Sequence, residues 1–98
     1  MKNNLIKIFS NILENTDKLR TIYNSRGSET QNKKLAEESA ELIKELLKGT
    51  QNSIEEELSD VFVVASQLLL TELKADTIVA TMNEKIDREL LRIKNEND

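Results

Sequence analysis

The stretch that decides the fold reads LAEESAELIKELLKGTQNSIEEELSDVFVVASQLLL, residues 35 to 70. It carries two acidic pairs, each spaced i, i+3 and therefore on one helix face: Glu38 with Glu41, and Glu57 with Asp60. Gly49 stands between them, and each pair is centred nine and a half residues from it. If Gly49 marks an antiparallel turn, both pairs lie at the same height on neighbouring helices. Four carboxylates then converge, which predicts either a metal site or four mutually repelling neighbours.

Two helices are predicted around Gly49. The first spans residues 29–48 or 32–48 and ends where Gly49 offers the C′ position that commonly terminates helices. The second spans about 53–73 and opens on a capping box, S-x-x-E, that starts at Ser53.

The flanking segments are predicted to be helical as well. Residues 3–24 carry apolar side chains at three-and-four spacing, typical of one amphipathic helix with a gap near Asn15. The polar residues 25–32 indicate a connector, with a lid over the site as the alternative interpretation. A last helix spans about 76–94. Residues 1–98 are therefore predicted to form one all-α domain, a four-helix antiparallel bundle.

The amino-acid composition limits the kinds of functional site that the chain can form. The 98 residues include no Cys, His or Pro, and 33% are charged. Disulfides, thiolate or imidazole metal ligands and Ser-His catalysis are excluded, which leaves carboxylates, amines, hydroxyls and hard cations. The net charge of −4 argues against nucleic-acid binding, which needs a basic surface. No signal peptide and no apolar run of about 18 residues is present, so we expect a cytoplasmic protein without membrane contact.

Glu57 is the carboxylate that surface electrostatics explains least. It falls inside the apolar sector of its helix, between Val64 and Leu68 on a helical wheel. The same helix turns Val63 and Leu70 away from its main apolar stripe, so other helices or a second subunit must cover them.

A basic stripe follows one edge of the apolar arc on the last helix. Its members, at i, i+3 and i+7, are Lys85, Arg88 and Arg92. Carboxylates can bind Mg²⁺, which keeps several waters and takes substrate phosphates, and two such ions suit phosphoryl chemistry. Cationic side chains would then pair with the phosphates. A solvated stripe and ordinary surface pairs, such as Lys34 with Glu38, are the plainer alternatives.

The same residues resemble a known family. Residues 37–41, EESAE, followed after fifteen residues by 57–60, ELSD, are similar to the EExxE…ExxD signature of the MazG-like all-α nucleoside triphosphate pyrophosphohydrolases. Residues 83–88, NEKIDR, resemble the family's later N-x-K-x-x-R element. The resemblance covers roughly residues 30–92 and fits the small, stand-alone members.

The resemblance implies a site. Its catalytic and Mg²⁺-binding carboxylates are Glu38, Glu41, Glu57 and Asp60, with Mn²⁺ as an alternative ion. The residues near the triphosphate are Asn83, Lys85 and Arg88, and the stripe adds Arg92. Glu37 matches the first acid of the signature but points away on the helical wheel. Several relatives hold the base with aromatic side chains, and the candidates here are Phe9, Tyr23 and Phe62.

The resemblance also implies an activity and an assembly. The enzyme would hydrolyse nucleoside triphosphates, deoxy or ribo, between the α and β phosphates to a monophosphate and pyrophosphate. Members form homodimers or dimer-built tetramers with sites near the subunit interface. The alternatives are a non-catalytic helical dimerisation module, or a related pyrophosphatase acting on another nucleotide such as phosphoribosyl-ATP.

Overall fold

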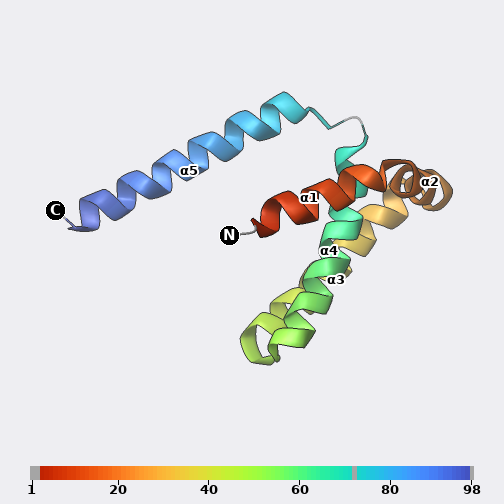
Figure 1. Cartoon of the computed structure of the whole chain (residues 1–98), viewed down its shortest axis with the longest axis horizontal. Coiled ribbons are helices and arrows are strands. Elements are labelled where there is room, and N and C mark those ends of the chain that lie inside the picture. The colour runs from red at the N-terminus through yellow and green to blue at the C-terminus, as the bar shows by residue number, and fades with distance from the viewer. Residues whose placement is uncertain (1–2, 72, 98) are drawn as a thin grey trace.

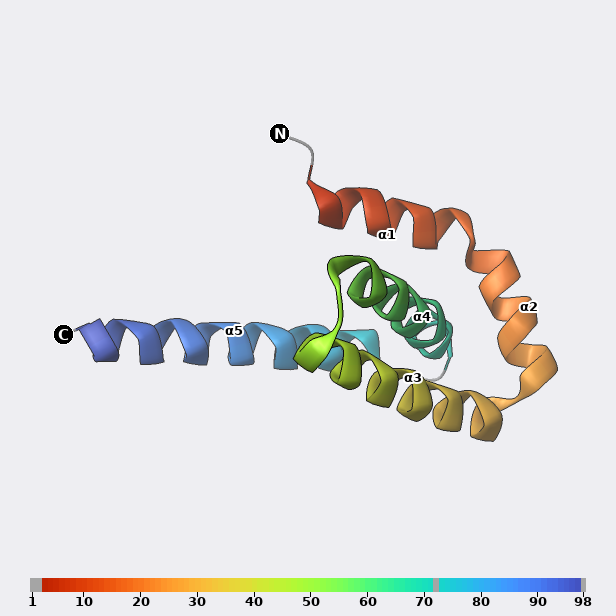
Figure 2. The same ribbon diagram turned by 90° about the horizontal axis from the view of Figure 1, so that it is seen from below.

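A computed structural model describes residues 3–71 and 73–97, and every regular element within them is a helix. The helices, in order, are α1 (Asn4–Glu14), α2 (Thr16–Arg26), α3 (Ser28–Lys48), α4 (Gln51–Leu69) and α5 (Ala75–Asn97). α3 and α4 form an antiparallel hairpin, and α4 lies inside an arc made by α1, α2 and α3 (Figure 2). α5 extends away from the other helices (Figure 1). The predicted all-α class is confirmed.

The α3–α4 hairpin has one well-defined register. Gln31 Nε2 donates a hydrogen bond of 2.8 Å to Gln67 Oε1, and both side chains are buried. These two residues each lie eighteen positions from Gly49. Residues equidistant from Gly49 therefore lie at about the same height on the two helices, since both rise equally per residue. The predicted antiparallel turn is confirmed.

Gly49 ends α3 as predicted, but the reason is space and not backbone angle. Its φ of −84° and ψ of 172° are extended values that any residue adopts. A Cβ at this position would lie 2.5 Å from Glu45 Oε1 and 2.5 Å from Ser53 Oγ. The ends of α3 and α4 approach so closely that only glycine fits without a shift of its neighbours.

The segment 3–24 forms two helices, so residues 3–71 and 73–97 contain five helices and not the four predicted. The break falls at Asn15, where the apolar spacing has its gap. Asn15 Nδ2 donates to the Asn11 carbonyl at 2.8 Å, and Thr16 Oγ1 donates to the Leu13 carbonyl at 2.7 Å. Such side chains compete with backbone amides for helix carbonyls, which favours a helix end at this point.

Two helix starts differ from the prediction. Residues 25–32 are helical except for Gly27, whose φ is +91°, so no loop is present that could act as a lid. The polar sequence indicated a connector, but packing of Gln31 against α4 favours the helix over local propensity. α4 begins at Gln51, because Thr50 Oγ1 accepts a hydrogen bond from Ser53 N at 3.3 Å and caps the helix earlier than expected.

The chain alone buries little apolar surface. Leu19 and Val64 are its buried hydrophobic residues among those described. The accessible surface is 8175 Å², whereas a compact monomer of 11.2 kDa exposes about 5,700 Å². The radius of gyration is 16.0 Å, against about 12.6 Å for a compact domain of this length. The predicted four-helix bundle does not form within one chain, since α5 lies apart from the hairpin.

We predict that the hydrogen bond between the buried side chains of Gln31 and Gln67 stabilises the hairpin. Gln67→Leu leaves the Gln31 amide buried without its acceptor and should lower the free energy of unfolding by about 1–3 kcal/mol. Gln31→Leu with Gln67→Leu removes both polar groups and should restore most of that loss. Urea unfolding of both single variants and the double variant gives the coupling energy.

Gln51→Leu, at the exposed start of α4, is the matched control and should change stability by less than about 0.5 kcal/mol. Strict additivity of the two single changes at Gln31 and Gln67 would show that the pair does not act as a unit.

Candidate metal centre

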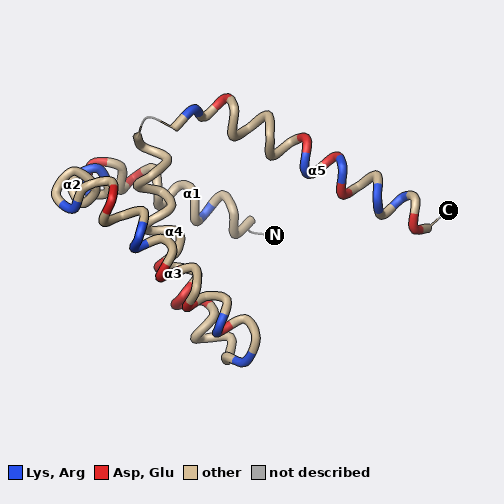
Figure 3. Tube along the Cα trace, turned by 180° about the vertical axis from the view of Figure 1, so that it is seen from behind, with Lys and Arg blue, Asp and Glu red and all other residues tan. Residues whose placement is uncertain are grey.

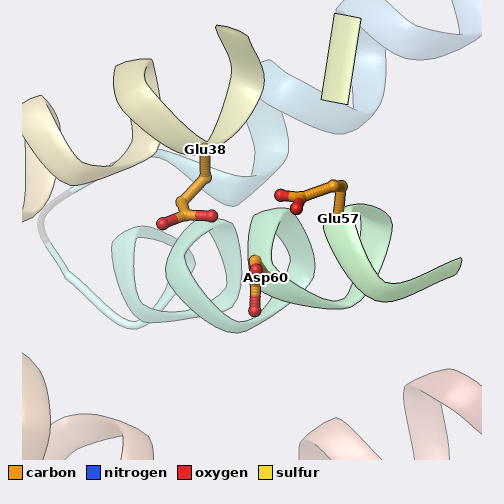
Figure 4. Close-up of side chains that lie close together, drawn as sticks. All are labelled: Glu38, Glu57 and Asp60. Carbon is orange, nitrogen blue, oxygen red and sulfur yellow. The ribbon is translucent and has the colours of Figure 1, made fainter. Parts of the chain in front are cut away.

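Three of the four predicted acids meet between α3 and α4. Carboxylate oxygens of Glu38, Glu57 and Asp60 all lie within 4.8 Å of one another. Glu38 reaches across from α3, and Glu57 turns its carboxylate from α4 toward it (Figure 4). Glu38 and Asp60 are each eleven positions from Gly49, so the register that joins the buried glutamines also brings these acids together. We call these three residues the acidic trio.

The acidic trio fits a hard divalent cation. Two oxygens bound to one Mg²⁺ at about 2.1 Å lie at most about 4.2 Å apart. The limit of 4.8 Å on the observed separations exceeds that value by only about 0.6 Å, a difference that small side-chain rotations can close. Oxygen ligands alone are also the donor set that Mg²⁺ and Mn²⁺ prefer.

Glu57 has the most perturbed ionisation in the cluster. Its partial burial raises the pKa of its carboxyl above the ordinary value, and the charges of Asp60, Glu38 and Glu41 raise it further. Among the described residues, no ion pair neutralises Glu57. A cation held by the trio would reverse this effect, because it favours the deprotonated carboxylates.

Glu41 lies beside the acidic trio and not within it. Its side chain is exposed, although its charge still acts on Glu57. Lys34 Nζ lies 3.4 Å from Glu38 Oε1, as expected for an ordinary surface pair, and the Glu38 side chain is only 16% exposed. Glu37 is exposed on α3. Three of the four predicted ligands therefore lie together, and the role of Glu41 as a fourth ligand stays a prediction.

The basic stripe lies on α5, away from the α3–α4 hairpin. Lys85, Arg88 and Arg92 are exposed on α5, away from the acids of the hairpin (Figure 3). Arg88 Nη2 is 4.0 Å from Glu84 Oε1, and Arg92 Nη1 is 3.3 Å from Glu89 Oε2, both pairs within α5 itself. The structure does not bring the stripe to the acidic trio of the same chain.

Asn83 is separated from the stripe by helix geometry. It precedes Lys85 by two positions on α5, which places the two side chains about 160° apart around the helix axis. The two side chains therefore leave α5 on nearly opposite sides. The sequence grouped them by their family motif, and the helix separates them.

The three aromatic candidates lie at two different places in the structure. Phe9 and Phe62 pack edge to face, with ring centroids 6.3 Å apart and an angle of 86° between planes. Phe62 also lines an apolar cavity of about 630 Å³ beneath α1. Tyr23 lines a more polar cavity of about 770 Å³ with Arg20 and Gln67, between α2, α3 and the end of α4.

The buried glutamines are the residues that sequence reasoning missed. Gln31 and Gln67 lie seven positions beyond Glu38 and Asp60, on the sides away from Gly49, so they continue the same seam one heptad further. Equal spacing from Gly49 was available in the sequence as a signal for this pair.

The site is thus a helical hairpin that carries a carboxylate trio in an all-α chain without His or Cys, and oxygen ligands are the donor set that hard divalent cations prefer. The family model for the MazG nucleotide pyrophosphohydrolase domain matches residues 26–90. The chain belongs to this family, whose members typically use a divalent metal, and the family points to nucleotide pyrophosphohydrolase activity. No curated protein and no solved structure matches the chain. None of the described helices is long and apolar enough to cross a membrane.

We predict that Mg²⁺ stabilises the folded protein through the acidic trio. At a concentration of one hundred times Kd, ligand linkage gives about 2.7 kcal/mol, which differential scanning calorimetry would detect as a rise in Tm. Asp60→Asn removes one ligand and should reduce the rise. Glu56→Gln makes the same charge change on an exposed neighbour and should leave it in place. An equal loss in both variants would indicate a general charge effect.

We predict a pH dependence of stability in metal-free protein. The pKa of Glu57 is raised above 4.5 in the folded state, so that state holds the proton more tightly than the unfolded chain does. The free energy of unfolding should therefore fall as pH rises from the ordinary carboxyl pKa through the raised one. Urea unfolding with a chelator between about pH 4 and pH 8 covers this window. Glu57→Gln should flatten the slope there, and an unchanged slope would contradict the assignment.

Proposed function

We propose that the protein hydrolyses nucleoside triphosphates, with Mg²⁺, at the bond between the α and β phosphates. The products would be a nucleoside monophosphate and pyrophosphate. The observation that carries the proposal is the set of three carboxylate oxygens within 4.8 Å, placed on facing helices in a chain of the MazG family. The substrates would be nucleoside triphosphates that carry deoxyribose or ribose.

In this proposal the carboxylates have two roles, cation binding and proton transfer. The acidic trio would hold the cation, which supplies charge to the phosphates and lowers the pKa of a bound water. Glu41 is exposed beside the trio and is left free to orient the attacking water and accept its proton. The water oxygen would attack the α-phosphorus in line, and the bond to the bridging oxygen of the departing pyrophosphate would break. Mn²⁺ would suit the same ligands.

Cationic side chains are needed on the phosphate side. Lys85 and Arg88 would offset the charge that develops on the departing pyrophosphate, with Arg92 extending the stripe. Asn83, on the other edge of α5, would contact a different part of the substrate or of the assembly.

We further propose that the four-helix arrangement forms between chains, in a homodimer or a dimer-built tetramer. The large exposed apolar surface supports this proposal, because a monomer of this size normally covers it. The net charge of −4 disfavours nucleic acid as the partner.

A panel of nucleoside triphosphates with Mg²⁺, with products separated by chromatography, tests the reaction. We expect monophosphate and pyrophosphate in equal amounts and no turnover with a chelator. Glu57→Gln and Asp60→Asn should each lower kcat at least about 100-fold while the helical content stays unchanged. Glu56→Gln is the control of equal charge. Orthophosphate released from the γ position would rule out cleavage at the α–β bond.

The exposed apolar face of α5 also fits a non-catalytic helical interaction module. That function predicts no Mg²⁺-dependent rise in Tm and no turnover of any nucleotide. Turnover of phosphoribosyl-ATP alone, within the same panel, would favour the related pyrophosphatase activity instead.

A further inference from the structure

One lysine lies directly beside the acidic trio of its own chain. Lys34 Nζ is 3.4 Å from Glu38 Oε1, and among the described residues it is the cationic group that pairs with a member of the trio. Lys34 precedes Glu38 by about one turn of α3, so the two side chains share a face of the helix, and Glu38 reaches from there toward α4 (Figure 4). The basic stripe of α5, by contrast, lies away from the hairpin (Figure 3).

The register of the hairpin determines what lies opposite Lys34. Lys34 and Val64 are each fifteen positions from Gly49, so they lie at about the same height on α3 and α4. Val64 is buried and apolar and offers the ammonium group no acceptor. Glu38 is therefore the acceptor of Lys34, and the lysine side chain is still 52% exposed. An ammonium group has three donors, so one carboxylate leaves donors free for a further acceptor.

The Lys34–Glu38 pair has the spacing of an ordinary surface pair, but its acid is not at the surface. The neighbouring pair of Lys33 with Glu29 has the same spacing and a distance of 3.5 Å, and its side chains are 74% and 86% exposed. The side chain of Glu38 is only 16% exposed, and it belongs to a trio whose carboxylate oxygens lie within 4.8 Å of one another. Lys34 thus lies at the edge of a crowded, partly buried negative site.

A divalent cation at the trio changes which partner suits Lys34. The ammonium group and the cation compete for the Glu38 carboxylate, because both are positive and both are stabilised by its oxygens. In its observed position Lys34 Nζ would lie at most about 5.5 Å from a cation bound to Glu38 Oε1 at about 2.1 Å. Repulsion at that distance favours release of Lys34 from Glu38. Phosphate oxygens held by the same cation are then strong acceptors within reach, and lysine commonly binds phosphate.

We propose that Lys34 is a substrate-binding residue: when a divalent cation occupies the acidic trio, Lys34 leaves Glu38 and donates hydrogen bonds to phosphate oxygens of the nucleotide bound there. The inference rests on the proposed phosphate chemistry and adds a cationic group from the hairpin itself. Lys34 thus weakens binding of the cation alone and strengthens binding of the cation and the phosphates together.

These two effects have opposite signs, so binding measurements separate them. Lys34→Gln should bind Mn²⁺ alone roughly 3- to 10-fold more tightly, because one positive charge within a few ångströms of the site is lost. The same variant should bind pyrophosphate, in the presence of Mg²⁺, about 10- to 100-fold more weakly, as expected for the loss of one hydrogen bond to a charged group. Electron paramagnetic resonance of Mn²⁺ and isothermal titration calorimetry with pyrophosphate measure the two affinities.

Lys33→Gln is the matched control, because it removes the same charge from the adjacent position and breaks only the exposed pair with Glu29. Both affinities should then change less than about 2-fold. Lys34→Arg keeps the positive charge and should restore most of the affinity for pyrophosphate. Circular dichroism checks that every variant keeps the helical content of the wild type.

Weaker binding of Mn²⁺ alone by Lys34→Gln would show that the lysine only positions Glu38, and it would overturn the inference. Equal losses of pyrophosphate affinity in Lys33→Gln and Lys34→Gln would also overturn it, since they would indicate a general charge effect. Wild-type protein that binds no pyrophosphate with Mg²⁺ would reject the inference whether or not nucleotides are hydrolysed. Binding of pyrophosphate that requires both Mg²⁺ and Lys34, without turnover of any nucleoside triphosphate, would keep the role of Lys34 while rejecting the proposed reaction.

Discussion

The hydrogen bond between Gln31 and Gln67 fixes the alignment on which the candidate site depends. A slip of one residue between α3 and α4 would move each side chain by about 1.5 Å along the axis and about 100° around it. Glu38 and Asp60 would then no longer face each other. An amide pair holds such an alignment more strictly than apolar packing does, because a slipped pair would leave buried polar groups without partners.

The same alignment brings like charges together, so repulsion between the carboxylates of the site destabilises the hairpin that positions them. The carboxylates of Glu38, Glu57 and Asp60 disfavour the close approach of α3 and α4 whenever all three are ionised. The neutral contacts on either side of them hold the helices in place. Gly49 permits the close turn at one end, and the glutamine pair locks the other, one heptad beyond the acids. A cation at the trio would relieve the repulsion without changing the register.

Sequence reasoning predicted what the symmetry about Gly49 encodes and missed what depends on contacts across space. The hairpin, the end of α3 and the meeting of Glu38 with Asp60 follow from spacing alone. Residues 25–32 looked like a connector because they are polar, and only their packing on α4 makes them helical. Glu41 was grouped with Glu38 by its i, i+3 spacing, and the same spacing does keep Glu57 and Asp60 together in the trio. Spacing along one helix therefore does not decide which carboxylate meets the neighbouring helix, because that depends on how α3 packs on α4.

The position of α5 was beyond sequence reasoning because its apolar arc specifies burial without specifying the partner. Apolar residues repeating every 3.6 positions indicate that one face of a helix is buried in the folded protein. The period does not indicate which helix, or which chain, packs against that face. In this chain the hairpin exposes Ile43, Leu46 and Leu47 while α5 exposes Met82 and Ile86, so both apolar surfaces are left open at once. The acids of the trio lie together on the hairpin, whereas the basic residues of α5 lie apart from them (Figure 3). Which surface covers the apolar arc of α5 therefore also decides which charged groups come to lie beside its basic edge, and neither can be read from the period of the helix.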